Sequence, residues 1–343
     1  ITVFRPCSGL WAVGGLTRLT DSGLSITEWR PVTGSVPPMN DADWQAEFAK
    51  YRESPEFQLQ NSHMTLEAFK SIYWWEWGHR LLGRVIGLVW AAGFAFFWAT
   101  KRIPAGWTGR LLVLGLLGGL QGAIGWWMVA SGLTGRMVDL ASYRLATHLG
   151  LAFAILGLTF WYILDLRRSE TDLLQARRQG ERRLFAVATG LLHLSFLQIL
   201  LGALVAGIDA GRAFPTWPLM GDSFFPADAF YVPGGGAVWR AFFENPGLVQ
   251  FVHRVTGYLV LALAAVAYVK ARQSAHPLTT GAFLLVLVGV MAQVALGVVT
   301  VLNGAPLALG LAHQLGAVAV FAFILRARHL ARTPVVQSIR GPK

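Results

Sequence analysis

Residues 278–301 read LTTGAFLLVLVGVMAQVALGVVTV, a stretch without a charged side chain that is long enough to cross a lipid bilayer. A membrane-spanning helix needs about 20 mainly apolar residues, because the hydrocarbon core is about 30 Å thick. Seven other stretches are also mainly apolar over a similar length, so the sequence predicts an all-α integral membrane protein with eight transmembrane helices. The eight spans are expected near residues 3–20, 77–99, 111–130, 145–165, 184–207, 250–269, 278–301 and 308–326.

The composition agrees with a surface that faces lipid. Of the 343 residues, 54% are hydrophobic and only 14% are charged, with a mean hydropathy of +0.49. Soluble domains carry about 25% charged residues. The net charge of +11 reflects where the basic residues stand and indicates no nucleic-acid partner. The single cysteine, Cys7, excludes a disulfide within the chain, and no cleavable signal or transit peptide is expected at its start.

The distribution of charge predicts the orientation of the helices. If both termini lie inside, the inner segments hold 17 basic and four acidic residues, whereas the rest of the chain holds 12 basic and 14 acidic residues. Cytoplasmic loops of membrane proteins carry an excess of Lys and Arg. We therefore expect both termini on the cytoplasmic or matrix side and two long outer connections, at 21–76 and 208–249. The first includes Trp44, Phe48 and Tyr51 at helical spacing and is expected to form an amphipathic helix.

The two outer connections also reveal an internal repeat. Asp21, Gly23, Trp29, Ser35 and Pro38 match Asp209, Gly211, Trp217, Ser223 and Pro226 at one offset of 188 residues. Each half contains four expected spans, so both halves point the same way and form a parallel repeat. The sequence thus predicts two pseudo-symmetric four-helix bundles, an N-terminal half at 1–170 and a C-terminal half at 183–343.

Four of the eight histidines recur in the repeat: His79, His148, His253 and His313. Each stands near the outer end of a span, and each half contributes two at similar depth. Two imidazoles at one height inside a helical bundle suit the two axial positions of a heme iron. A zinc or copper site would need further ligands, and a histidine that only hydrogen-bonds a neighbouring helix is the simpler alternative. We interpret these four as heme-iron ligands.

The other histidines are expected to have ordinary surroundings. His193 lies inside a span and is expected to pack in the core, and His276 and His329 at the inner surface, like His63 in the outer connection, are expected to be solvated.

Two arginines and one carboxylate accompany the histidines. Arg80 and Arg254 each follow a predicted ligand, where they could pair with heme propionates or simply anchor the interface. Glu76 stands about one helical turn before His79, whereas the matching residue in the second half is Gln250. A carboxyl group beside only one heme could exchange protons with a reacting group there, so Glu76 is the candidate catalytic residue. An exposed glutamate at a membrane interface is the alternative.

Motifs along nearly the whole chain resemble the heme A synthase family of mitochondria and proteobacteria. They are VGGLTRLT (13–20), SGLS (22–25), PEF (55–57), MTL (64–66), FK (69–70), Glu76 with HR (79–80), GR (83–84), QG (121–122), GW (125–126), YRLA (143–146), HLG (148–150) and FPTWPLMG (214–221).

The resemblance implies an oxidoreductase that oxidises the C8 methyl group of heme O to a formyl group by successive hydroxylations. The product, heme A, serves cytochrome oxidase. It further implies that His79, His148 and Arg80 bind the substrate heme, that His253, His313 and Arg254 bind a heme B cofactor, and that Glu76 is catalytic. The location implied is the bacterial cytoplasmic or mitochondrial inner membrane. Heme O synthase, cytochrome oxidase assembly factors and a second copy of the chain are the partners that this function suggests.

Two other classes explain part of the pattern. A di-heme cytochrome b that only transfers electrons accounts for the four histidines but gives Glu76 no role. A transporter built from repeats accounts for the duplication but not for the histidine pairs, and its spans would be broken near the midplane. Identification of the hemes in the purified protein distinguishes the three classes.

Overall fold

The computed structural model describes residues 13–133, 140–232 and 234–335, and regular structure in these ranges is helical apart from one isolated bridge between Met220 and Ser223. Seven described helices are long and apolar enough to cross a membrane. They are α4 (Leu66–Ala99), α5 (Thr108–Leu133), α6 (Ser142–Leu166), α8 (Arg182–Gly207), α11 (Pro246–Ala271), α12 (Pro277–Leu302) and α13 (Leu307–Arg332).

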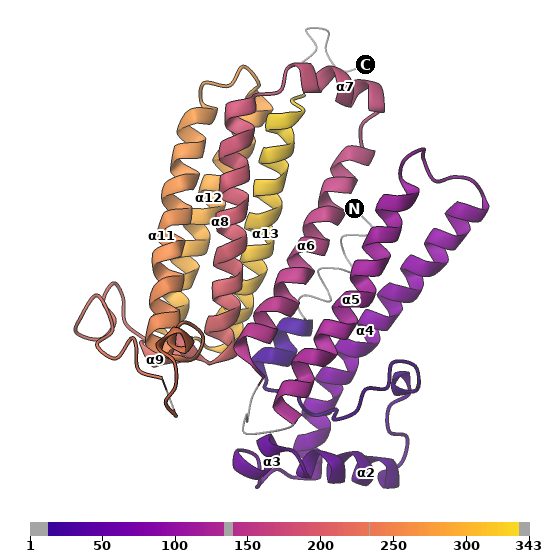
Figure 1. The fold of residues 1–343 in the computed structure, drawn as a ribbon, viewed down its shortest axis with the longest axis vertical. Helices are drawn as coiled ribbons and strands as arrows, with labels where there is room; N and C mark the ends of the chain where they lie inside the picture. The colour runs from indigo at the N-terminus through magenta and orange to yellow at the C-terminus, as the bar shows by residue number, and fades with distance from the viewer. Residues whose placement is uncertain (1–12, 134–139, 233, 336–343) are drawn as a thin grey trace. The chain divides into compact units, whose positions relative to one another are not determined.

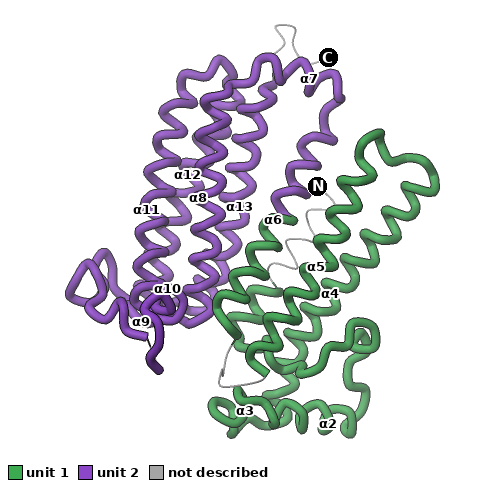
Figure 2. Tube along the Cα trace, viewed as in Figure 1, with its two compact units in different colours: residues 1–155 green, residues 156–343 purple. Residues whose placement is uncertain are grey.

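These seven helices confirm the predicted all-helical membrane protein and seven of its eight spans. The remaining span, expected at 3–20, falls mostly outside the described residues, although residues 13–19 are helical. The chain forms two compact units, residues 1–155 and 156–343 (Figure 2). Helix α6 contributes to both.

In the second unit, α8, α11, α12 and α13 pack side by side as four long helices (Figure 1). Their shared core includes Leu191, Ala264, Phe283 and Ile324, each no more than 1% exposed. Helix α11 begins after Asn245, whose side chain accepts a hydrogen bond from the Leu248 amide at 2.8 Å and so caps the helix. The shorter elements of the second unit are α7 (Glu170–Arg178), α9 (Ala210–Ala213), η2 (Val238–Arg240) and α10 (Ala241–Glu244).

In the first unit, α4 is much longer than a bilayer requires. Its 34 residues span about 51 Å at 1.5 Å per residue, against a hydrocarbon core of about 30 Å. The extra turns at its N-terminal end pack against the predicted amphipathic helix, which is confirmed as α2 (Asp41–Arg52). The remaining short elements are η1 (Thr33–Ser35) and α3 (Pro55–Leu59).

An aromatic cluster joins α2 to the projecting part of α4. Trp44 and Tyr51 of α2 are buried against Phe69 and Tyr73 of α4, with ring centroids of Trp44 and Tyr73 5.1 Å apart. The Tyr51 hydroxyl donates to Glu56 Oε2 at 3.1 Å and accepts from the Asn61 amide at 2.9 Å. The amphipathic pattern in the sequence therefore covers an extension of a membrane helix.

Two predictions about other histidines were wrong. His193 is exposed on α8, because it lies two residues from both Leu191 and Ser195, which are buried on the opposite face. His329 is only 4% exposed, because α13 continues past the expected end of its span and carries the ring against Trp161. There His329 Nε2 lies 3.0 Å from Asp165 Oδ1. His63, as expected, is exposed.

Candidate functional site

The first histidine pair lies on two helices of the first unit. His79 is on α4 and His148 on α6, and the two side chains are close enough to interact electrostatically. Each imidazole lies against a glycine of another segment. A Cβ built on Gly14 would lie 2.8 Å from Cε1 of His79, and one built on Gly125 would lie 2.9 Å from Cε1 of His148. Both rings occupy space that any other residue would fill.

The second pair repeats this arrangement. His253 is on α11 and His313 on α13, and they too interact electrostatically. A Cβ on Gly202 of α8 would lie 3.1 Å from Cε1 of His253, and one on Gly297 of α12 would lie 3.0 Å from Cε1 of His313. The structure thus brings the four predicted ligands together as two pairs, each ring seated on a glycine.

The residues present in both units fit a heme. The donors are two imidazoles per unit, the pair of axial ligands that a heme iron accepts, while the macrocycle supplies the other four positions. One ring nitrogen of His79, Nδ1, is buried without a hydrogen-bond partner in the described part of the chain. A buried polar atom of this kind calls for a partner, which a bound ligand can provide. The glycine seats bring the imidazoles close to the neighbouring backbone without steric conflict.

Glu76 is the most tightly held polar side chain near these pairs. It is 2% exposed, and its Oε2 accepts hydrogen bonds from Ser25 Oγ and from the Ile26 amide, both at 2.7 Å. Its Oε1 accepts from Arg80 Nη2 at 2.5 Å, within a salt bridge along α4. The carboxyl group is therefore fixed about one turn from His79, and the interpretation as an exposed interfacial glutamate was wrong.

The matching position in the second unit has different chemistry. Gln250 is buried as well, but its Nε2 donates only weakly to the Phe214 carbonyl, at 3.3 Å. At the offset of 188 residues, Ile26 corresponds to Phe214 and Ser25 corresponds to Ala213, which has no hydroxyl. The serine is thus present only where the carboxylate is present. Sequence reasoning found the difference between Glu76 and Gln250 but missed Ser25, which the same offset identifies.

The two arginines are held by equivalent backbone groups. Arg80 Nη2 donates to the Ile26 carbonyl at 3.0 Å, and Arg254 Nη2 donates to the Phe214 carbonyl at 2.9 Å. Arg80 also forms the salt bridge with Glu76, whereas the hydrogen-bond partners described for Arg254 are neutral carbonyl oxygens. The charge of Arg254 is therefore better placed to attract an anion than that of Arg80, which a carboxylate already neutralises.

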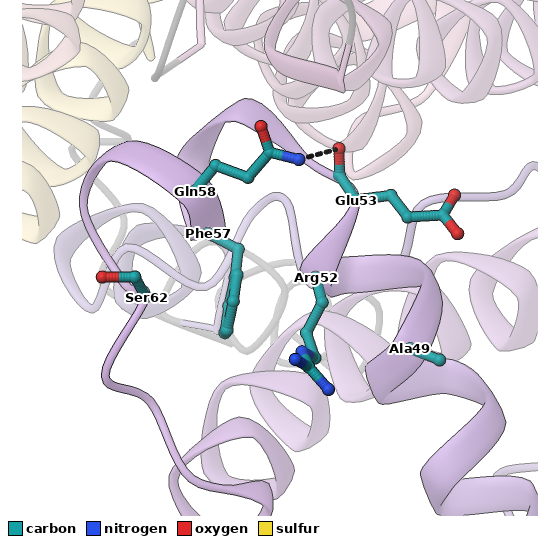
Figure 3. Close-up of a pocket in the computed structure, with 6 residues that line it drawn as sticks. All are labelled: Ala49, Arg52, Glu53, Phe57, Gln58 and Ser62. Atoms are coloured by element: carbon teal, nitrogen blue, oxygen red, sulfur yellow. Dashed lines mark hydrogen bonds between the residues drawn. The ribbon is translucent and has the colours of Figure 1, made fainter.

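A surface hollow of about 460 Å³ lies between α2 and α3, away from these residues (Figure 3). Within it, Gln58 Nε2 donates to the Glu53 carbonyl at 3.4 Å. None of the predicted site residues lines the hollow, so it is separate from the candidate heme sites. Its lining residues are Ala49, Arg52, Glu53, Phe57, Gln58 and Ser62.

Comparison with known proteins agrees with the motifs found in the sequence. Residues 7–325 match the cytochrome oxidase assembly protein family. The chain is 63% identical over 341 residues to a heme A synthase of Paracoccus denitrificans, covering 99% of this chain and 89% of the relative. Heme A synthases of Ruegeria sp. and Cereibacter sphaeroides are 60% and 62% identical, each matched over 99% of this chain and over 89% and 88% of the relative, respectively. The chain therefore belongs to the heme A synthases within the cytochrome oxidase assembly protein family.

Proposed function

We propose that this protein is the membrane-bound oxidoreductase that converts heme O to heme A, by oxidising the C8 methyl group to a formyl group. The observation that carries the assignment of the reacting site is the buried Glu76, held by Ser25, Ile26 and Arg80 one turn from His79. A protein that only transfers electrons between two hemes would need no such carboxylate. The high identity to heme A synthases supports the same reaction.

The substrate heme is assigned to the N-terminal half. His79 and His148 would hold its iron, with Arg80 and Glu76 on the same helix as His79. When bound, the heme iron would supply the redox chemistry by which the methyl group is oxidised to the aldehyde. Glu76 Oε1 and Oε2 are the atoms that would receive or return protons as the methyl group is oxidised.

The C-terminal half is assigned to a resident heme B. His253 and His313 would be its axial ligands, and Arg254 would pair with a propionate, because its described partners leave its charge uncompensated. Gln250 replaces the carboxylate here, and its amide is not an acid or base at physiological pH. This half therefore suits a cofactor that passes electrons and stays in place.

The charge distribution supports an orientation with both termini on the cytoplasmic or matrix side of the inner membrane. Both histidine pairs would then lie in the outer half of the bilayer. Heme O synthase and cytochrome oxidase assembly factors are the proposed partners, because heme O and heme A are poorly soluble and benefit from direct transfer.

The test is the heme content of the purified full-length chain, produced with and without co-expressed heme O synthase and extracted in acid. We expect heme B in both samples, and heme O or heme A in addition when heme O is supplied. Two equivalents of heme B and no conversion of heme O would instead identify a di-heme cytochrome b and overturn the proposal.

A further inference from the structure

Each of the four paired histidines lies against a glycine, and three of them also lie against a glutamine. On α5, α8 and α12 a glutamine stands four residues before the glycine that faces the imidazole, so that both lie on one face of the helix. The three pairs are Gln121 with Gly125, Gln198 with Gly202, and Gln293 with Gly297.

Each glutamine contacts its histidine in the same way. The Nε2 atoms of Gln121, Gln198 and Gln293 donate to the backbone carbonyls of His148, His253 and His313 at 3.0, 3.0 and 2.7 Å. The same amide nitrogens lie 3.1 to 3.3 Å from ring nitrogens of these histidines. Each amide is thus hydrogen-bonded to the backbone carbonyl of its histidine and lies in contact with the imidazole ring of the same residue.

The geometry shows that the amide restrains the ring and is not a simple partner of one nitrogen. Gln121 Nε2 lies 3.2 Å from both Nδ1 and Nε2 of His148. The lone pairs of the two ring nitrogens point in diverging directions, so one atom cannot lie along both. Gln121 and Gly125 of α5 both contact the His148 ring. Together they limit rotation about the side-chain bonds of His148.

The glutamines are themselves confined. A Cβ built on Gly316 of α13 would overlap the amide oxygen of Gln293, and one built on Gly257 of α11 would lie 3.3 Å from Gln198 Nε2. Glycines on the histidine-bearing helices α11 and α13 therefore leave room for these two amides. The histidine and the glutamine fix each other.

His79 differs from the other three. It has the glycine, Gly14, but the residue four positions before that glycine in the sequence is Leu10, whose side chain has no hydrogen-bond donor and which lies outside the described residues. No described residue lies within 4 Å of a Cβ built on Gly83, which stands four residues after His79 as Gly257 stands after His253. His79 Nδ1 has no hydrogen-bond partner in the described ranges.

This difference matches what the two hemes require, if the proposed function is correct. A cofactor that stays bound needs two fixed ligands, whereas a substrate heme must enter and leave, so one of its ligands must let go. Groups that orient a metal ligand typically change metal affinity or activity about 10- to 100-fold when mutated. We propose that Gln121, Gln198 and Gln293 are positioning residues that lock His148, His253 and His313 onto their hemes, and that His79, which lacks such a glutamine, is the ligand that releases the substrate heme.

The test measures heme dissociation from the full-length protein in detergent, loaded with heme B and heme O, by transfer to excess apomyoglobin. Gln198→Met and Gln293→Met remove the amide donor while keeping side-chain length, and Gln273→Met, at an exposed position, is the matched control. We expect the first two variants to lose heme B about 10-fold faster or more. Gln121→Met should speed the loss of heme O in the same way, because His148 would then release the heme as readily as His79 does.

Electron paramagnetic resonance of the oxidised heme separates positioning from general destabilisation. An imidazole that is still bound to the iron but no longer restrained by the glutamine can rotate relative to the heme, which shifts the low-spin signal. Partial unfolding only weakens that signal. Parental rates and an unshifted signal in the Gln198 and Gln293 variants would overturn the locking role, and unchanged heme O loss in Gln121→Met would overturn the contrast between His148 and His79. These experiments measure heme dissociation and not heme A formation. A protein that binds both hemes but makes no heme A would therefore refute the proposed function while leaving the dissociation rates to decide the roles of the glutamines.

Discussion

Ser25 donates its hydroxyl hydrogen to Glu76, with Oγ 2.7 Å from Oε2, and Ala213 stands at the matching position of the second half. The serine belongs to a connection that precedes α2, whereas the glutamate lies within α4. This long-range hydrogen bond therefore helps to hold Oε2 of Glu76 in place. The Ile26 amide and Arg80 complete its surroundings.

Ser25→Ala should slow heme A formation while leaving the content of both hemes unchanged. A hydrogen bond to a charged group contributes about 1.5–3 kcal/mol, which corresponds to a rate decrease of about 10- to 100-fold if it is felt fully in the transition state. Ser25→Thr retains the hydroxyl and serves as the control. Equal rates of heme A formation in the alanine variant and the parent would remove Ser25 from the site.

Glu76→Gln should keep the fold and the resident heme B but abolish or stall heme A formation. The change is nearly isosteric and gives the first half the residue that the second half has at position 250. Chromatography of the extracted hemes should show heme O with partly oxidised intermediates. Heme A production at the parental rate would mean that the carboxyl group takes no part in the reaction.

His253→Met and His313→Met should each remove or alter the heme B of the C-terminal half. A thioether is a weaker ligand of the oxidised iron than an imidazole, so the visible spectrum should change even where heme remains. His193→Met, at an exposed position of α8, is the matched control and should leave the spectrum unchanged. If both ligand variants retain parental heme B content and spectrum, the assignment of this half is wrong.

Gly202→Ala should lower heme B occupancy although alanine usually stabilises a helix by about 1 kcal/mol relative to glycine. The added methyl would lie 3.1 Å from Cε1 of His253 and push the imidazole away from its seat. Gly190→Ala on the same helix is the control, because nothing lies within 4 Å of its Cβ in the described structure. Heme content per protein, measured by absorbance after extraction, should fall only in the first variant.

Tyr51→Phe should destabilise the aromatic cluster by about 1 kcal/mol, because Glu56 and Asn61 each lose a hydrogen bond. Burial, with a further contribution from Glu56, raises the pKa of Tyr51 above its ordinary value of 10.0. The folded protein therefore holds this proton more tightly than the unfolded chain. The resulting stability is present below pH 10 and is lost as the pH rises above it. Melting temperatures in detergent from pH 8 to 11 should fall less steeply in the variant than in the parent.

Much of the fold could be predicted from the sequence because a membrane helix has a strong local signal. The seven described spans stand out by their apolar length, and the histidine pairs by their recurrence in a repeat. Ser25 and Gln198 could not be predicted from local pattern, since each acts on a residue more than 50 positions away. His193 and His329 were misplaced because the apolar content of a span indicates neither which face packs nor where the helix ends.

The glycine that faces each of the four histidines has a consequence for how this enzyme could have arisen. A single ancestral four-helix protein that paired with itself would already have held two equivalent hemes, and gene duplication followed by fusion would have freed one copy to diverge. The differences described between the halves amount to a few exchanges, Ala to Ser at 25, Gln to Glu at 76 and Gln to Leu at 10, read from the second half to the first. These three positions thus mark where two halves built on the same histidine arrangement differ in chemistry.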